Sequence, residues 1–277
     1  MINGLSFDIE DWFQVENLRQ VCPYETWEKQ EIRVEKNTER LLELLQKFNQ
    51  KATFFILGWI AEKKPELVKK IAALGHEIAS HGYKHELVYT LTPKEFEEDL
   101  LKSKKMLEDL TGQLVIGYRA PSFSITEKSL WAIDILSQNG FKYDSSIFPT
   151  SLHDRYGLKM SSTYTFTFEN GLTEFTLSTF RLGGINLPIA GGGYFRLLPY
   201  GMLKKFLKKF NEEGCHFIFY LHPWEIDGKQ PRVNIKYSYR FRHYINLDKT
   251  YAKLERLLSE FRFSPLNALL TGKPYNE

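Results

Sequence analysis

Cysteine is scarce in this sequence, long apolar runs are missing, and neither sign of charge dominates. Cys22 and Cys215 are the two cysteines among 277 residues, which excludes a disulfide framework and a CxxC metal knuckle and fits a reducing compartment. The 37 basic and 34 acidic residues leave a formal net charge of +3 without a basic block. A nucleic-acid partner is therefore disfavoured.

The beginning of the sequence and its hydropathy bear on where the protein resides. Residues 1–8 show neither the basic nor the apolar region of a signal peptide. No stretch approaches the roughly 18 consecutive apolar residues of a membrane span. We therefore expect a cytoplasmic, soluble protein without a membrane span.

The chain does contain a regular alternation of strand-like and helix-like patterns, and it is long enough to bury a large core. This alternation predicts an α/β protein in which a parallel sheet closes, or nearly closes, into a barrel. Residues 153–182 depart from it with short alternating runs that predict β-rich insertions. The predicted strands are residues 5–8, 52–57, 75–80, 114–119, 141–144 and 216–221, and the predicted helices are residues 36–50, 65–74, 92–110, 126–138, 199–213 and 248–261.

Two histidines follow the third predicted strand, in the stretch Ser80-His81-Gly82-Tyr83-Lys84-His85. Residues four apart lie on one face of a helical turn, about 6 Å from each other, so both imidazoles can reach one divalent ion. Barrels of alternating strands and helices carry their chemistry where strands end in loops. This pair is therefore a candidate metal site.

Three carboxylates stand close together where the first predicted strand ends, in Asp8-Ile9-Glu10-Asp11-Trp12. Such crowding is unfavourable unless a cation binds there or one carboxylate takes up a proton. An acidic turn in solvent is the alternative, but the flanking Phe7 and Phe13 indicate partial burial. The cluster is a second candidate part of the same site.

Polar clusters stand at the ends of five predicted strands, and as an ordered set they resemble the polysaccharide deacetylase family, also called NodB homology or carbohydrate esterase family 4. The resemblance covers roughly residues 5–225. The segment from Gly191 to Tyr200 and the tail after Arg232 resemble the branch encoded beside exopolysaccharide and exosortase genes. The five clusters are Asp8-Ile9-Glu10-Asp11, Ser80 to His85, Arg119-Ala120-Pro121-Ser122-Phe123, Asp144-Ser145-Ser146 and Leu221-His222-Pro223.

The resemblance implies a distorted (β/α) barrel of seven or eight strands and a metal-dependent hydrolase. Its expected activity is removal of N-acetyl groups from an N-acetylated oligo- or polysaccharide, in exopolysaccharide metabolism. We expect a single domain over residues 1–277, in which residues 1–225 form the barrel and residues 226–277 an extension packed on it. The oligomeric state does not follow from the resemblance.

Metal ligands are implied at His81 and His85, completed by a carboxylate of the first cluster. Most family members have two adjacent aspartates there, whereas Ile9 intervenes in this chain. Strand alternation places Glu10 on the face of Asp8, while residue type favours Asp11, so both stay candidates. Zinc is the expected ion, with cobalt, nickel, manganese or iron as alternatives for such ligands.

Catalytic roles follow from the same motifs. Asp8 matches the family's catalytic base and Arg119 the arginine that holds it. His222 matches the catalytic acid, which protonates the departing amine, and Asp144 matches the aspartate that orients this histidine.

Substrate contacts are expected at Pro121, Phe123 and Trp224. Ser122 stands where the family usually has an aromatic residue, and Phe123 follows one position later, which bears on the shape of the acyl pocket. A backbone N–H near Phe123, together with the metal, is expected to hold the oxyanion. Trp224 offers a wall for a sugar ring, and aromatic residues make up 15% of the chain, above what a core normally needs.

Two other functions compete with deacetylation. A carbohydrate-binding or assembly protein of the exopolysaccharide machinery could keep the barrel without chemistry, and the altered first motif favours it. A hydrolase of another C–N bond, such as a cyclic amide or a formamide, is the other alternative. Bound metal and the identity of the product distinguish the three.

Overall fold

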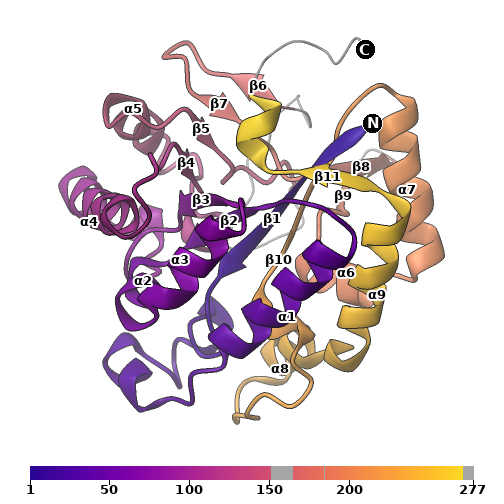
Figure 1. The fold of residues 1–277 in the computed structure, drawn as a ribbon, viewed down its shortest axis with the longest axis horizontal. Coiled ribbons are helices and arrows are strands. Elements are labelled where there is room, and N and C mark those ends of the chain that lie inside the picture. Colours follow the sequence, from indigo (N-terminus) through magenta and orange to yellow (C-terminus); the bar gives the residue numbers. More distant parts are fainter. Residues whose placement is uncertain (151–164, 184, 271–277) are drawn as a thin grey trace.

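The computed structural model describes residues 1–150, 165–183 and 185–270 of the chain (Figure 1). In this part of the chain, nine strands form one curled, mostly parallel sheet, and helices pack around its outside. A separate antiparallel hairpin joins β8 (Thr179–Leu182) to β9 (Ile185–Pro188). The predicted α/β class with a barrel-like parallel sheet is therefore confirmed, with the described strands forming a half-barrel.

The sheet places strands from both ends of the chain side by side. Its spatial order is β10-β1-β2-β3-β4-β5-β7-β6, and β11 also pairs with β1. Each pair is parallel except β6 with β7. The strands are β1 (Ile2–Ile9), β2 (Thr53–Ile56), β3 (Glu77–Ser80), β4 (Gly117–Tyr118), β5 (Tyr143–Asp144), β6 (Phe166–Thr167), β7 (Thr173–Glu174), β10 (Ile218–Leu221) and β11 (Arg262–Ser264).

The helices follow the amphipathic segments of the sequence and bury their apolar faces against the sheet. Residues next to its two ends determine where helix α4 begins and ends. Thr92 and Glu95 form a capping box at its start, and Gly112 ends the helix with a φ of 66°. The helices are α1 (Val34–Lys47), α2 (Gly58–Lys63), α3 (Pro65–Ala73), α4 (Pro93–Thr111), α5 (Trp131–Gln138), α6 (Gly192–Leu197), α7 (Tyr200–Glu212), α8 (Tyr237–Tyr244) and α9 (Leu247–Glu260).

Several predictions about elements were wrong in detail. Helix α5 begins at Trp131 rather than at residue 126, and the helices α2, α6 and α8 were not predicted. His81 and His85 do not lie on a helical turn, because Gly82 and His85 adopt positive φ values of 71° and 57° in a loop after β3. Part of the predicted β-rich insertion, residues 153–164, lies outside the described residues.

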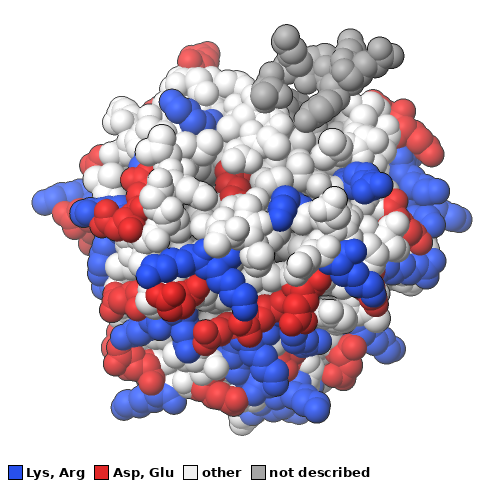
Figure 2. Space-filling view, viewed as in Figure 1, with Lys and Arg blue, Asp and Glu red and all other residues white. Residues whose placement is uncertain are grey.

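Charges of both signs are mixed on the face of the molecule seen in Figure 2. Ion pairs join the α1 side chains of Glu35 and Glu39 to Lys64 and Lys70 in and before α3. Such exposed pairs contribute little to stability, but their alternation leaves this face without a basic surface of one sign. None of the described helices is both long and apolar enough to cross a membrane.

Candidate metal and catalytic centre

The loops that follow the parallel strands meet at one edge of the sheet and enclose a cavity of about 500 Å³. Parallel pairing explains this convergence, since the carboxyl ends of β1, β2, β3 and β10 lie in register at the same edge. Seven of the polar residues that line the cavity come from four of the five predicted clusters or follow them directly. These seven are Asp8, Glu10, His81, His85, Ser122, His222 and Glu225.

Glu10, His81 and His85 form a group that fits a divalent metal ion. One potential ligand atom from each lies within 4.8 Å of the other two, and all three residues are buried. Nδ1 of His81 is 2.7 Å from the carbonyl oxygen of Arg119, which leaves its Nε2 to face the cavity. Burial lowers the pKa of His81 to about 4, so its imidazole is neutral at pH 7, as a metal ligand must be.

The carboxylate of Glu10 lies between two imidazoles. Its Oε2 is 3.0 Å from Nε2 of His85, and its Oε1 is 2.9 Å from Nε2 of His222. Burial alone would raise the pKa of Glu10, but the two histidines hold it well below its ordinary value. Oε2 is buried and has no hydrogen-bond donor of suitable geometry among the described residues, which is the environment in which a cation would complete its coordination.

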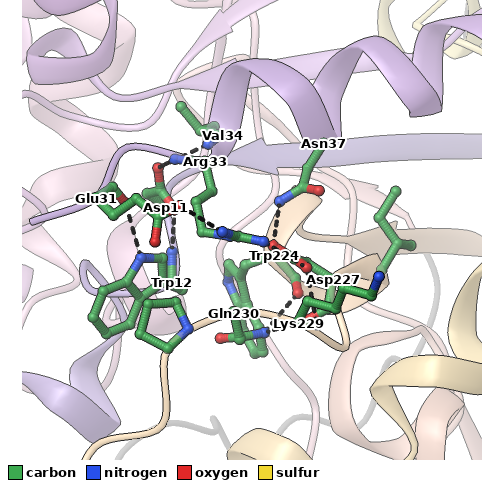
Figure 3. A network of polar contacts seen from close by, with 12 residues as sticks. Asp11, Trp12, Glu31, Arg33, Val34, Asn37, Trp224, Asp227, Lys229 and Gln230 are labelled. Atoms are coloured by element: carbon green, nitrogen blue, oxygen red, sulfur yellow. Dashed lines mark hydrogen bonds and ion pairs between the residues drawn. The ribbon is translucent and has the colours of Figure 1, made fainter.

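Asp11 lies outside this group, because both of its oxygens are bound to backbone N–H groups (Figure 3). Oδ2 accepts hydrogen bonds from Arg33 and Val34 at the start of α1, and Oδ1 accepts one from Trp12. Burial raises the pKa of Asp11 to about 6 even though these N–H groups oppose the shift. Of the two candidate carboxylates, the structure therefore brings Glu10 to the histidines and uses Asp11 as a helix cap.

The same network fastens the loop after β10 to the loop after β1. Asp227 accepts hydrogen bonds from Nε of Arg33 at 2.6 Å and from the side chain of Asn37 (Figure 3). Asp11 binds the backbone of that arginine, so the two acidic residues hold one helix end from opposite sides.

Asp8 is held by a fully buried arginine. Nη1 of Arg119 is 2.6 Å from Oδ1 of Asp8 and also donates to Oγ of Ser6 at 2.8 Å. The remaining guanidinium N–H groups bind the carbonyl and hydroxyl oxygens of Ser145, and the guanidinium lies 4.1 Å from the ring centroid of Phe55. The second oxygen of Asp8 is 3.8 Å from Nε2 of His222, so the aspartate faces the cavity.

His222 has carboxylates on both sides of its ring. Nε2 faces Glu10, and Nδ1 is 2.7 Å from Oε1 of Glu225. Burial alone would lower the pKa of His222, but Glu10 and Glu225 raise it to about 10, so the imidazole carries a proton on each nitrogen at pH 7. A protonated imidazole that faces the cavity is able to act as a general acid.

Asp144 is placed differently from the prediction. Its oxygens accept hydrogen bonds from Oγ of Ser146 at 2.5 Å and from the Ser146 N–H, and its carboxyl pairs with that of Glu174. Burial raises the pKa of Glu174 well above its ordinary value, so this pair shares a proton. The contact to His222 that was predicted for Asp144 is made by Glu225 instead.

The expected substrate residues form two walls of the cavity. Ser122 and Phe123 adopt positive φ values in the turn Pro121–Phe123, and the ring of Phe123 packs 4.9 Å from that of Tyr220. The N–H of Phe123 donates to the carbonyl of Ala120, so it is already used. Pro121, the first residue of this turn, is buried and is not among the residues that line the cavity, unlike the expectation.

Trp224 forms the opposite wall through a stack of rings. Its ring centroid lies 5.2 Å from that of His222 and 4.4 Å from that of His243, with interplanar angles of 28° and 11°. The stack restricts rotation of the His222 ring.

Sequence reasoning missed two residues of the site, Glu225 and Arg196. Glu225 had a local signal, because His-Pro-Trp-Glu has the spacing of a capping box with proline in the first turn, and the structure forms this box. Arg196 had none, since it is 29 positions from the glutamate that it binds. Gly191 serves close backbone packing, because a Cβ there would lie 1.8 Å from the carbonyl oxygen of Tyr220.

Two family models match the chain. Residues 21–143 match the model described as polysaccharide deacetylase, and residues 145–271 match a domain of unknown function, DUF3473. The first match is shorter than the predicted span of residues 5–225. It contains both histidines of the metal group, whereas Glu10 precedes it and His222 belongs to the second match.

Known proteins are similar to parts of this chain or to its fold. The peptidoglycan deacetylase of Helicobacter pylori is 42% identical over 108 residues, which are 39% of this chain and 36% of that protein. A polysaccharide deacetylase candidate from Mycobacterium smegmatis has a TM-score of 0.64 at 20% identity and covers 96% of this chain and 87% of its own. The Puue allantoinase has a TM-score of 0.62 at 14% identity, covering 99% and 91% of the two chains. Both structures share the fold.

Proposed function

The chain carries a domain of the polysaccharide deacetylase family, and on that basis we propose that it is a metal-dependent hydrolase that removes N-acetyl groups from an N-acetylated polysaccharide or glycan. One observation supports this proposal above the others. Glu10, His81 and His85 converge in a cavity whose other polar residues include Asp8 and His222. This set offers metal ligands, a proton acceptor and a proton donor within one space.

The metal would be held by Nε2 of His81, a ring nitrogen of His85 and the carboxylate of Glu10. Two imidazoles and one carboxylate leave coordination positions open, which suits zinc and also accepts cobalt, nickel, manganese or iron. When bound, the ion supplies the Lewis acidity that hydrolysis of an unactivated amide needs. The remaining chemistry falls to the side chains of this chain.

Asp8 is the proposed proton acceptor for the attacking water. The ion pair with Arg119 holds one oxygen of this carboxylate and leaves the second oxygen facing the cavity. His222 is the proposed proton donor to the departing nitrogen, because it is protonated at neutral pH and lies on the same cavity as Asp8. Ser122, Phe123 and Trp224 would form the walls against which the acetyl group and the sugar lie.

We further propose that residues 1–277 act as one domain, with residues 226–277 packed on the barrel. Strand β11 pairs with β1, and the loops after β1, β3 and β10 all contribute to the cavity. The setting in exopolysaccharide metabolism is supported only by the resemblance of residues 191–200 and of the tail after Arg232. A location in the cytoplasm is supported by the scarcity of cysteine.

The test is to measure bound metal and released acetate on the same preparation. We expect about one equivalent of divalent metal and release of acetate from a chitooligosaccharide or an acetylated glycan. In His81→Ala both should be lost, whereas His216→Ala, which removes a half-buried histidine outside the cavity, should keep both.

Two outcomes would replace the proposal. Wild-type protein that binds glycan, but binds no metal and releases no acetate, would be a catalytically silent binding protein. Formate or a ring-opened product in place of acetate would indicate a hydrolase of another C–N bond.

A further inference from the structure

The carboxylate of Glu225 binds His222 at two points. Oε1 lies 2.7 Å from Nδ1 of the ring and also accepts the backbone N–H of the same histidine at 3.2 Å. Glu225 is completely buried in the turn Pro223–Ile226 that follows β10. Ring and backbone are therefore held by one side chain three residues away.

A buried arginine holds Glu225 in turn. Nε of Arg196, in helix α6, is 2.6 Å from Oε2 of Glu225. The two Nη atoms donate to the carbonyl oxygens of the last residues of α8 and the residue after it, at 2.9 to 3.0 Å. The guanidinium thus joins Glu225 to the end of α8, and few of its donors remain unused.

We propose that Glu225 and Arg196 are the positioning residues for the catalytic histidine: Glu225 fixes the orientation of the His222 ring, and Arg196 fixes Glu225. This inference rests on the proposed deacetylation. Both residues lie in the segment that matches the domain of unknown function, and they would orient the proton donor. Glu225 would thus have the role that was predicted for Asp144.

The chemical step shows why orientation matters. Water oxygen bonds to the amide carbon and its proton passes to Asp8; the C–N bond then breaks, and the nitrogen keeps the electron pair and takes a proton from Nε2 of His222. A carboxylate on Nδ1 holds Nε2 toward that nitrogen, as in other pairs of histidine and carboxylate. An aryl acetate has a stable phenolate as leaving group, so its hydrolysis needs no such proton.

The contrast between amide and ester provides the test. Glu225→Gln keeps the size of the side chain and an acceptor oxygen but removes the charge. We expect kcat on an N-acetylated chitooligosaccharide to fall 100-fold or more, the scale of general acid catalysis, with KM changed less than about threefold. Hydrolysis of 4-nitrophenyl acetate and the bound metal should stay within about threefold of wild type. Arg196→Lys should shift the ratio of amide to ester turnover in the same direction.

Asp227→Asn is the matched control. Asp227 belongs to the same loop and is paired with Arg33 as tightly as Glu225 is with Arg196, but its side chain binds α1 instead of His222. This variant loosens the loop without touching the histidine ring. Its ratio of amide to ester turnover should equal that of wild type.

Several results would overturn the inference. Equal loss of amide and ester turnover in Glu225→Gln, or the same change of ratio in Asp227→Asn, would leave Glu225 with a purely structural role. If Glu225→Gln does not fold, an unchanged ratio in folded Arg196→Lys has the same meaning. Wild-type protein without metal or acetate release would overturn the proposed function itself, and the inference with it.

Discussion

At the scale of single residues, the neighbouring carboxylates of Glu10 and Asp11 have different roles. Glu10 faces two histidines, while Asp11 binds the first backbone N–H groups of α1. The direction of each side chain decides this, because β1 ends at Ile9 and the chain turns there. A metal ligand and a helix cap can therefore stand side by side in the sequence.

Substitution of each carboxylate should have a distinct effect. Glu10→Gln should lose bound metal and turnover, because a neutral amide is a poor ligand for such an ion. Asp11→Ala should keep the metal but lower the free energy of unfolding by about 1 to 2 kcal/mol, since it removes a cap from α1. Metal analysis and urea unfolding of both variants test this, and metal loss in Asp11→Ala with retention in Glu10→Gln would reverse the two roles.

At the scale of elements, close backbone contacts around β10 decide where His222 stands. Gly191 lies against this strand with a φ of 137°, and the N–H of Tyr220 donates to the carbonyl of Ala190 at 2.7 Å. A side chain at position 191 would occupy the place of the Tyr220 carbonyl oxygen. Glycine is needed there for contact as well as for conformation.

Two glycine substitutions separate these requirements. Gly112→Ala, at the end of α4, has open space around it and a φ of 66°, so it should cost about 1 to 2 kcal/mol for the left-handed conformation alone. Gly191→Ala should cost clearly more, because strand β10 must also move, and it should reduce acetate release. Urea unfolding compares them, and equal destabilisation would show that the contact with β10 is relieved at little cost.

At the scale of the whole molecule, several titratable groups are buried in a fixed protonation state. Burial lowers the pKa of His76, just before β3, to about 4 and that of His243, in α8, to about 3. Both pKa values lie below the ordinary 6.5, so the unfolded chain binds more protons than the folded one as the pH falls from about 6.5 toward 4. These histidines thus contribute stability above pH 6.5 that is lost in acid.

The variant His76→Gln measures this contribution. The free energy of unfolding of wild type should fall more steeply than that of the variant between pH 6.5 and 4, by up to about 1.4 kcal/mol per pH unit. Above pH 7.5 the difference between the two proteins should be constant. The Asp144–Glu174 pair has raised pKa values, so its contribution to stability changes with pH in the opposite direction. Both proteins contain this pair, and its contribution cancels when their free energies of unfolding are subtracted. Parallel pH curves would show that folding does not lower the pKa of His76.

Local patterns alone determined the order of the main strands and helices, the cap and end of α4, and the position of the polar clusters at strand ends, because these depend on neighbouring residues. Only the tertiary structure decided that Glu10 rather than Asp11 reaches the histidines, that Asp144 pairs with Glu174 instead of His222, and that Arg196 holds Glu225. The contacts responsible join residues 22 and 29 positions apart, as Arg33 with Asp11 and Arg196 with Glu225 do. Periodicity and capping rules extend over a few residues, so such choices depend on how the elements pack.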